Sequence, residues 1–213
     1  MKYEAVIFDF DGIIAKTMED NYLAWKMAFK AYNVVIGHLE YFLLEGMNGK
    51  AVAETILKRR NMDVGLAEAV SGLKGKYYFN HHTFELYPGI FPLIDRIRHR
   101  LKIGLVSGAS TKRLKQTVPH GFLDKMEVII TGDTVRNSKP HPEPYLSAGK
   151  TLSVNAGNCL AVENAPLGIE SAKEAGMDCV GVCTTLDRKH LGQADFIVRD
   201  IDSLASFFYN MMN

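Results

Sequence analysis

The sequence predicts an α/β fold: a doubly wound, mostly parallel Rossmann-like sheet with a small α-helical cap domain inserted after its first strand. From residue 90 onward, short apolar runs alternate with helix-like stretches, which is the pattern of repeated βα units joined by right-handed crossovers. Residues 17–81 contain helical periodicity and no convincing strand. We therefore expect an α/β core domain of residues 1–16 and 82–213, and a helical cap domain of residues 17–81.

The first strand is expected at the apolar run 5–8, which leads directly into Asp9 and Asp11. In open α/β sheets ligands bind at the carboxyl ends of the strands, and Gly12 permits a tight turn there. Residues two apart in a strand point the same way, so we expect both carboxylates on one side. They would repel each other without a cation or a shared proton. A calcium loop is excluded because its glycine belongs at the sixth position and its glutamate at the twelfth.

The remaining elements follow from periodicity. Aromatic residues recur three and four positions apart in the first predicted cap helix, and a turn at 86–89 marks the return to the core. The aromatic face comprises Tyr22, Trp25, Phe29 and Tyr32, and further cap helices are predicted over 50–60 and 66–79. An apolar helix face follows the turn at Ile90, Leu93, Ile94 and Ile97, and strands are predicted over 103–106, 128–130, 159–162, 179–183 and 196–198.

The composition excludes several classes of partner. The chain has 213 residues and a formal net charge of +1, so it has no basic field for nucleic acid. No apolar run is long enough to cross a bilayer, and the N-terminus enters the first strand without a signal-like region, so we expect a cytoplasmic protein that binds no membrane. The odd number of cysteines, at 159, 179 and 183, suits a reducing compartment and buried structural thiols.

Three further segments could contribute to one site. Ser107 and Gly108 follow the second predicted strand, where a hydroxyl and backbone amides could bind a phosphate oxygen, although local helix capping is the commoner use. Lys139 lies in a segment stiffened by two prolines, and a solvated lysine is the alternative. Glu163 and Asn164 follow another buried strand, where Asn164 could ligate a metal or cap a helix.

With their order and spacing, these segments resemble the haloacid dehalogenase superfamily over essentially the full chain, in particular its β-phosphoglucomutase and phosphoglycolate phosphatase subgroup. Residues 9–12 (Asp-Phe-Asp-Gly) resemble its first motif and Ser107 its second. Lys139-Pro140 resembles the third motif and Glu163-Asn164 the fourth. The insertion resembles the family's small helical cap, and residues 87–89 (Tyr-Pro-Gly) resemble the return into the core.

The resemblance implies a Mg²⁺-dependent phosphatase that acts on a small phosphorylated metabolite, either a sugar phosphate or a phosphoglycolate-like compound. Asp9 would attack phosphorus to form an aspartyl-phosphate, and Asp11 would be the general acid and base. Lys139 would be catalytic as well, because it would cancel charge on the transferred group. The phosphate-binding residues would be Ser107, Gly108 and Lys139, and the metal would be bound by Asp9, Asp11, Glu163 and Asn164.

Two departures from the family pattern bear on function. The fourth motif commonly has two acids, and Asn164 stands in place of the second, so we expect weaker metal binding. In the cap, the mutase histidine would fall at Asn21, and the mutase arginine has no counterpart unless Lys50 replaces it. Net hydrolysis is therefore favoured over β-phosphoglucomutase-type transfer, and a catalytically impaired phosphate-binding module is a further alternative. Candidate substrate contacts in the cap are Thr17, Asn21, Asn48 and Lys50, with Trp25 a further candidate for lining it, and we expect a monomer or weak dimer.

Overall fold

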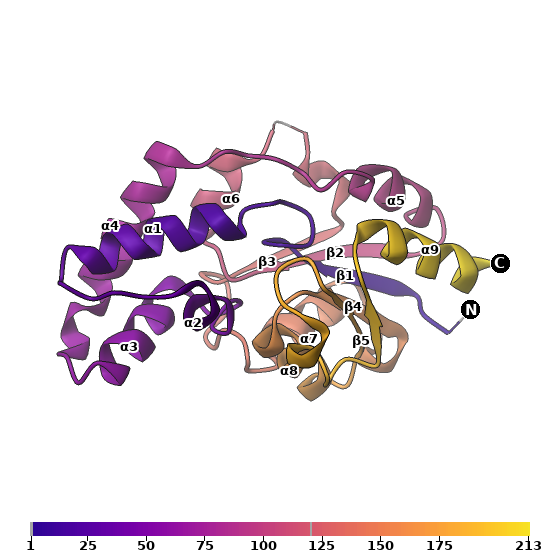
Figure 1. Cartoon of the computed structure of the whole chain (residues 1–213). Helices are drawn as coiled ribbons and strands as arrows, with labels where there is room; N and C mark the ends of the chain where they lie inside the picture. Colours follow the sequence, from indigo (N-terminus) through magenta and orange to yellow (C-terminus); the bar gives the residue numbers. More distant parts are fainter. Residues whose placement is uncertain (1, 120) are drawn as a thin grey trace.

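The computed structural model describes residues 2–119 and 121–213, and within them a six-stranded sheet forms the centre of the molecule (Figure 1). The strand order is β3-β2-β1-β4-β5-β6, and all five neighbouring pairs are parallel. The strands are β1 (Ala5–Asp9), β2 (Lys102–Ser107), β3 (Val128–Thr131), β4 (Cys159–Glu163), β5 (Asp178–Val182) and β6 (Phe196–Val198). The predicted doubly wound parallel sheet is confirmed.

Strand β1 lies in the middle of the sheet, and every one of its residues is buried, as expected for a continuous apolar run. It pairs with β2 on one side and with β4 on the other. The chain therefore winds outward in opposite directions from the β1–β4 pair. Such a reversal of strand order opens a crevice at the carboxyl ends of the two strands, and β1 and β4 end there at Asp9 and Glu163.

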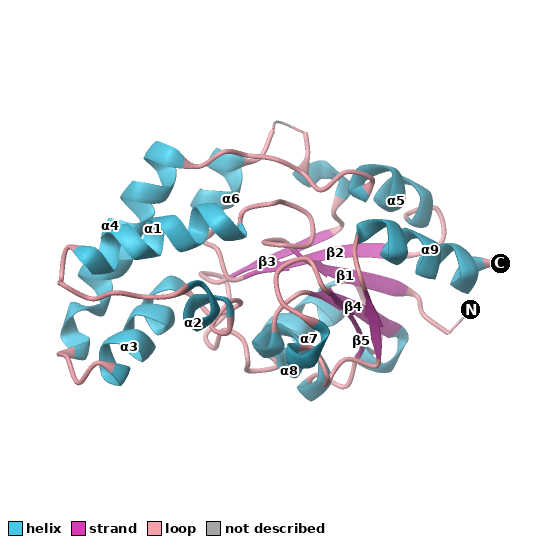
Figure 2. Ribbon diagram, viewed as in Figure 1, coloured by secondary structure: helices cyan, strands magenta, loops and turns pink. Residues whose placement is uncertain are grey.

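Helices cover both faces of this sheet (Figure 2). The apolar face of α5, made by Ile90, Leu93, Ile94 and Ile97 as predicted, shares one hydrophobic cluster with α9 and with one face of the strands. Helices α7 and α8 share a second cluster with the opposite face. The core helices are α5 (Ile90–Ile97), α6 (Thr111–Thr117), α7 (Glu143–Thr151), α8 (Pro166–Glu174) and α9 (Ile201–Met212).

The inserted segment is helical, as predicted, and has a hydrophobic cluster of its own built around Trp25, Phe29, Ile56 and Val70. Figure 1 shows its helices grouped to one side of the sheet. They are α1 (Met18–Lys30), α2 (His38–Phe42), α3 (Gly49–Arg59) and α4 (Ala67–His81). The short helix α2 is the addition to the predicted set.

Short 3-10 helices complete the secondary structure at η1 (Val64–Leu66), η2 (Leu123–Lys125), η3 (Ala156–Asn158) and η4 (Arg188–His190). The three cysteines are free thiols, with Cys159 and Cys179 buried and Cys183 half-buried. In the two described ranges, no helix is both long enough and apolar enough to cross a membrane.

Candidate active site

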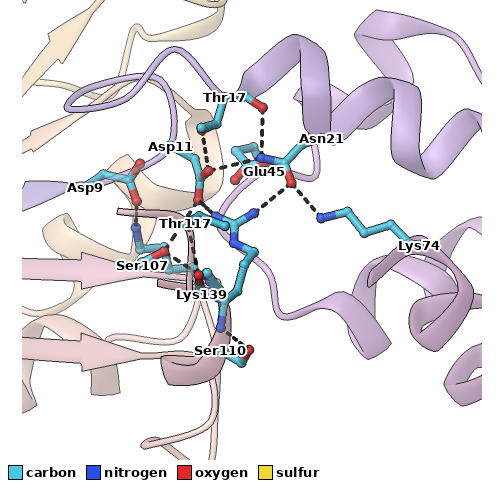
Figure 3. Close-up of polar contacts among 12 residues, drawn as sticks. Asp9, Asp11, Thr17, Asn21, Glu45, Lys74, Ser107, Ser110, Thr117 and Lys139 are labelled. Atoms are coloured by element: carbon cyan, nitrogen blue, oxygen red, sulfur yellow. Dashed lines mark hydrogen bonds and ion pairs between the residues drawn. The ribbon is translucent and has the colours of Figure 1, made fainter. Parts of the chain in front are cut away.

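A buried lysine joins the ends of two central strands. The Lys139 ammonium donates to Asp9 Oδ1 at 2.7 Å and to Glu163 Oε1 at 2.6 Å, and the lysine side chain is 1% exposed. Asp9 ends β1 and Glu163 ends β4, whereas Lys139 comes from the loop before α7. Figure 3 shows Lys139 reaching Asp9. The structure therefore brings together three of the predicted residues that are far apart in the sequence.

The charges in this cluster depend on one another. Burial alone would lower the pKa of Lys139, but the carboxylates of Asp9 and Glu163 outweigh it and raise the pKa. Burial raises the pKa of Asp9, the Lys139 ammonium opposes this, and the carboxylates of Glu163 and Asp11 add to it. One ammonium thus neutralises part of a strongly acidic, water-poor site, where each charge depends on its partner.

Both carboxylate oxygens of Glu163 accept hydrogen bonds. Besides Lys139, its Oε1 accepts a hydrogen bond from the Tyr145 hydroxyl at 2.8 Å. Its Oε2 accepts from the backbone amides of Asn164 at 3.0 Å and Ala165 at 3.4 Å. The carboxylate is therefore fixed in place by contacts from three directions.

Two buried oxygen atoms beside this cluster have no hydrogen-bond partner among the described residues: Asp9 Oδ2 and Asn164 Oδ1. Buried polar atoms are rarely left without a partner, so such atoms indicate a site for an ion or a water. Both are oxygen donors of the kind that Mg²⁺ prefers, and the residues present therefore fit that cation. Within the described ranges, no group of three or more His, Cys, Asp and Glu is arranged to hold a metal, and the donor at residue 164 is an amide oxygen.

Asn164 does not cap a helix, which answers the alternative left open by the sequence. The N-cap of α8 is Ala165, and the Asn164 amide instead donates to Thr185 Oγ1 at 2.8 Å. A Cβ atom at Gly12 would lie 2.1 Å from Asn164 Nδ2, and Gly12 has a φ of +89°. Glycine at position 12 therefore allows the turn after β1 to lie against this amide.

Asp11 lies in the turn beyond β1, and its carboxylate contacts residues of both the cap and the core. Its Oδ1 accepts from the Thr17 hydroxyl and, at 3.0 Å, from the Asn21 amide (Figure 3). Its Oδ2 forms an ion pair with Arg113 and accepts from Ser107 Oγ at the long distance of 3.5 Å. Burial acts to raise the pKa of Asp11, but the Arg113 guanidinium and the Thr17 hydroxyl outweigh it and hold the pKa below its ordinary value.

Arg113 is the main site residue that the sequence analysis did not find. It lies in α6, where the Ser110 side chain caps the helix by accepting from the Arg113 amide at 3.2 Å. Its guanidinium also donates to Asn21 Oδ1 at 2.7 Å. The same amide oxygen accepts from Lys74 of α4 at 2.6 Å. A basic side chain soon after Ser107-Gly108 was the available signal, but Lys112 and Lys115 of the same helix are equally basic and are exposed.

The predicted cap contacts fall into two groups. Thr17 and Asn21 contact Asp11, as described, and Trp25 lines the cavity described below. Asn48 caps α3 by accepting from the Ala51 amide at 2.9 Å, and its amide donates to Ser138 Oγ at 3.4 Å. Lys50 lies on the surface, 60% exposed and 3.9 Å from Glu54, and it is not among the residues that line the cavity.

A cavity of about 200 Å³ lies between the cap helices and the core. It is lined by acidic, basic and aromatic side chains together with Gly108, and among the lining residues are Asp11, Glu45, Lys74, Tyr78 and Arg113. Burial, which is the larger cause, and the Asp11 carboxylate raise the pKa of Glu45 to about 7. Burial, again the larger cause, and the Arg113 guanidinium lower the pKa of Lys74 to about 7. The cavity is therefore lined by charged groups from both the cap and the core.

Gly108 brings the two parts of the molecule together at the rim of this cavity. A Cβ atom at position 108 would lie 2.8 Å from the backbone oxygens of Gly46 and Met47, which belong to the segment before α3. The absence of a side chain therefore lets this segment lie directly on the loop after β2. Ser107, next to it, ends β2, as predicted. Its hydroxyl accepts a hydrogen bond from the Ala109 amide at 3.1 Å.

Comparison with known proteins gives a consistent set of relatives. A sequence profile of the family described as haloacid dehalogenase-like hydrolase matches residues 6–182. A β-phosphoglucomutase of Bacillus subtilis is 31% identical over 94% of this chain and 91% of its own length. A validoxylamine A 7′-phosphate phosphatase of Streptomyces hygroscopicus subsp. limoneus is 27% identical over 93% of this chain and 94% of its own. The crystal structure of a β-phosphoglucomutase from Clostridium difficile superposes with a TM-score of 0.85 at 28% identity, and covers 98% of this chain and 96% of its own.

Proposed function

The chain belongs to the haloacid dehalogenase-like hydrolase family and is an enzyme of that family, and on this premise we propose that it is a Mg²⁺-dependent phosphatase of a small phosphorylated metabolite. A sugar phosphate or a phosphoglycolate-like compound is the proposed substrate class. The observation that carries the proposal is the Lys139 ammonium held between Asp9 and Glu163, beside an Asp9 oxygen that has no protein partner in the described ranges. The names of the relatives support phosphoryl transfer as the chemistry.

Asp9 is the proposed nucleophile. Its Oδ1 accepts a hydrogen bond from Lys139 at 2.7 Å, which fixes the carboxylate at the end of β1. Attack on phosphorus forms the bond between the aspartate oxygen and phosphorus, and the bond from phosphorus to the leaving oxygen breaks. The aspartyl-phosphate divides one difficult hydrolysis into two easier steps.

Asp11 is the proposed general acid and base. It protonates the leaving oxygen in the first step, and in the second it takes a proton from the water that attacks phosphorus and releases Asp9. The hydrogen bonds from Thr17 and Asn21 to its Oδ1 orient the carboxyl group. They leave proton transfer to Oδ2, which is paired with Arg113 in this structure.

Lys139 and a bound cation together make the attack of one anion on another possible. Two like unit charges about 4 Å apart cost about 4 kcal/mol at an effective dielectric constant near 20, so a phosphate dianion needs positive charge close by. Lys139 supplies one, and Ser107 with the backbone around Gly108 supplies hydrogen-bond donors at the neighbouring strand end. When bound, Mg²⁺ supplies further positive charge to the phosphoryl oxygens.

The residues proposed to hold Mg²⁺ are Asp9, Asn164, the main-chain oxygen of Asp11, and Glu163. Asp9 Oδ2 and Asn164 Oδ1 are the atoms without a competing partner among the described residues. Both oxygens of Glu163 already accept hydrogen bonds, so a direct bond from Glu163 requires one of these contacts to be given up. We expect the amide at 164 to weaken metal binding, because it lacks the formal charge of an acid.

Hydrolysis is proposed rather than mutase transfer because of two cap positions. Asn21 cannot titrate, and the exposed Lys50 is not among the residues that line the cavity. Transfer between two ends of one sugar requires a grip on both phosphates. β-Phosphoglucomutase-type activity and a catalytically impaired phosphate-binding module remain the two other outcomes of the experiment below.

The experiment measures phosphate release from p-nitrophenyl phosphate with and without Mg²⁺, by the wild-type chain and by Asp9→Asn. We expect Mg²⁺-dependent release that Asp9→Asn abolishes. β-Glucose 1-phosphate then separates the activities, because a phosphatase gives free phosphate and a mutase gives glucose 6-phosphate. Phosphate binding without turnover of any ester would overturn the proposal in favour of a binding module, and a panel of phosphorylated metabolites identifies the substrate.

A further inference from the structure

Tyr145 is a buried tyrosine that contacts both members of the ion pair between Lys139 and Glu163. It lies in the first turn of α7 and is completely buried. Its hydroxyl donates to Glu163 Oε1 at 2.8 Å. The Lys139 ammonium lies over its ring, 5.2 Å from the centroid, where a cation is attracted by the ring face. One side chain therefore touches the carboxylate with its hydroxyl and the cation with its ring.

The Lys139 ammonium has one N–H donor more than its protein partners use. An ammonium carries three donors. One goes to Asp9 Oδ1 at 2.7 Å and one to Glu163 Oε1 at 2.6 Å, and no third hydrogen bond forms among the described residues. In the proposed reaction the third donor is the one that can reach the transferred phosphoryl group. Its direction depends on how the ammonium is held by its other contacts.

The Glu163 carboxylate and the Tyr145 ring are both fixed by the packing of the core. A Cβ atom at Gly168 would lie 1.9 Å from Glu163 Oε1, so this oxygen lies directly against the first turn of α8. The Tyr145 ring belongs to the hydrophobic cluster that α7 and α8 share with one face of the sheet, and these two helices lie side by side (Figure 2). The hydroxyl therefore meets a carboxylate that has little freedom to move.

The Tyr145 hydroxyl limits the ways in which Lys139 can approach Glu163. A carboxylate oxygen has two lone pairs, and Glu163 Oε1 accepts from both Tyr145 and Lys139. With the hydroxyl on one side of this oxygen, the ammonium is left with the other. Without the hydroxyl, both sides are open, and the ammonium can turn toward Glu163 and away from Asp9.

We propose that Tyr145 is a positioning residue for phosphoryl transfer. Its hydroxyl, acting through Glu163, holds the Lys139 ammonium between the two carboxylates and directs the third donor at the transferred group. The inference rests on the proposed phosphatase function and deepens it. Phenylalanine at this position keeps the ring contact and loses only the hydrogen bond, so the role of the hydroxyl can be tested separately from that of the ring.

The first measurement compares Tyr145→Phe with a matched variant, Tyr3→Phe. The Tyr3 hydroxyl also donates to a carboxylate, Asp178 Oδ2, at 2.6 Å. Tyr3 precedes β1 and Asp178 begins β5, so this pair lies at the opposite end of the strands from the site. With p-nitrophenyl phosphate and Mg²⁺, we expect Tyr145→Phe to lower kcat by about 10-fold and to change KM by less than about two-fold. Tyr3→Phe should leave kcat within about two-fold of the wild type.

A double-mutant cycle tests whether the effect of Tyr145 passes through Glu163. Glu163→Ala removes the carboxylate that the hydroxyl contacts. Adding Tyr145→Phe to Glu163→Ala should then change kcat/KM by less than about two-fold, because the two side chains act as a unit. An equal loss in both backgrounds would show that Tyr145 does not act through Glu163.

A spectroscopic measurement follows Lys139 itself and needs no turnover. A buried ammonium exchanges its protons slowly with water, so the Lys139 ammonium of the isotope-labelled chain can be observed by proton–nitrogen NMR. Its signal is assigned by its loss in Lys139→Met. We expect Tyr145→Phe to shift this signal and Tyr3→Phe to leave it unchanged. The cycle with Glu163→Ala is read from the same signal if that variant has no measurable turnover.

The two levels of proposal fail differently. If no ester is hydrolysed, the phosphatase function fails, and the Lys139 signal still decides whether Tyr145 positions the ammonium. If esters are hydrolysed, an unmoved Lys139 signal in Tyr145→Phe, or a kcat equal to that of Tyr3→Phe, overturns the inference and leaves the phosphatase function standing. Each phenylalanine variant loses one hydroxyl bonded to a carboxylate, so their melting curves separate a loss of stability from a loss of positioning. All spectra and rates are compared at a temperature at which both variants are folded.

Discussion

Removing the Lys139 ammonium should destabilise the fold in a pH-dependent way. Lys139→Met keeps the length and apolar stem of the side chain and leaves Asp9 and Glu163 facing each other without a cation. Each lost contact, at 2.7 and 2.6 Å, is worth about 6 kcal/mol by Coulomb's law at an effective dielectric constant near 20. The cost of burying the ammonium offsets most of this sum, and breaking a buried ion pair by removing one partner costs about 3–5 kcal/mol in practice.

The pH dependence follows from the carboxyl groups left behind. In Lys139→Met the folded-state pKa of Asp9, which burial already raises, rises further above its unfolded value near 4. A carboxyl group whose pKa is raised by folding contributes most stability below its unfolded pKa. That contribution is lost as the pH rises toward the folded pKa. Because each pH unit in this window is worth about 1.4 kcal/mol per proton, the variant should lose about 2–3 kcal/mol more stability at pH 8 than at pH 5.5.

The assay is urea denaturation of the wild type, Lys139→Met and the double variant Lys139→Met, Glu163→Gln at both pH values. The double variant should recover part of the loss at pH 8, because one buried charge is gone. Lys150→Met is the matched control, since Lys150 lies in α7 and is exposed, and it should leave stability within about 0.5 kcal/mol of the wild type. An Lys139→Met chain as stable as the wild type at pH 8, or one with the same loss at both pH values, would refute the reasoning.

Three further predictions concern the cap, the cavity and the metal. Gly108→Ala places a Cβ atom 2.8 Å from the backbone oxygens of Gly46 and Met47, so the cap segment must shift. We expect kcat/KM for p-nitrophenyl phosphate to fall by about 100-fold. An unchanged rate would show that this contact does not matter for catalysis. Glu45→Gln removes an acid whose pKa is raised to about 7 by burial. The substitution should stabilise the fold at pH 8 by up to about 3 kcal/mol and have little effect at pH 4. Equal shifts of the melting temperature at both pH values would contradict this. Asn164→Asp adds a formal charge next to a buried oxygen site; we expect the Mg²⁺ concentration for half-maximal activity to fall, and a rise would argue against metal binding at residue 164.

The strand ends were predictable because they depend on local pattern and simple topology. An apolar run of strand length that ends in Asp9, and another that ends in Glu163, must meet at one edge once the sheet is parallel. The sequence gives no comparable rule for Lys139, which comes from a loop, and its place in the site followed only from the family resemblance. Its contact with both carboxylates is a property of the folded chain.

The cavity residues were less predictable because they depend on how the cap packs on the core. Arg113 and Lys74 lie on different helices, and helical periodicity does not distinguish Arg113 from its basic neighbours in α6. Lys50 illustrates the same limit, since it follows a glycine-containing turn of the expected kind and yet lies at the surface. Asn48 took a capping role instead, which is a common use of Asn at a helix start.

The most direct test of the proposed chemistry is whether phosphate becomes bonded to Asp9 during turnover. The chain is mixed with Mg²⁺ and p-nitrophenyl phosphate, quenched in acid within one turnover, digested and examined by mass spectrometry. We predict one added phosphoryl group on the peptide that contains Asp9, and none on that peptide from Asp9→Asn. A phosphoryl group on another residue, or Asp9→Asn turnover as fast as that of the wild type, would contradict the proposed nucleophile.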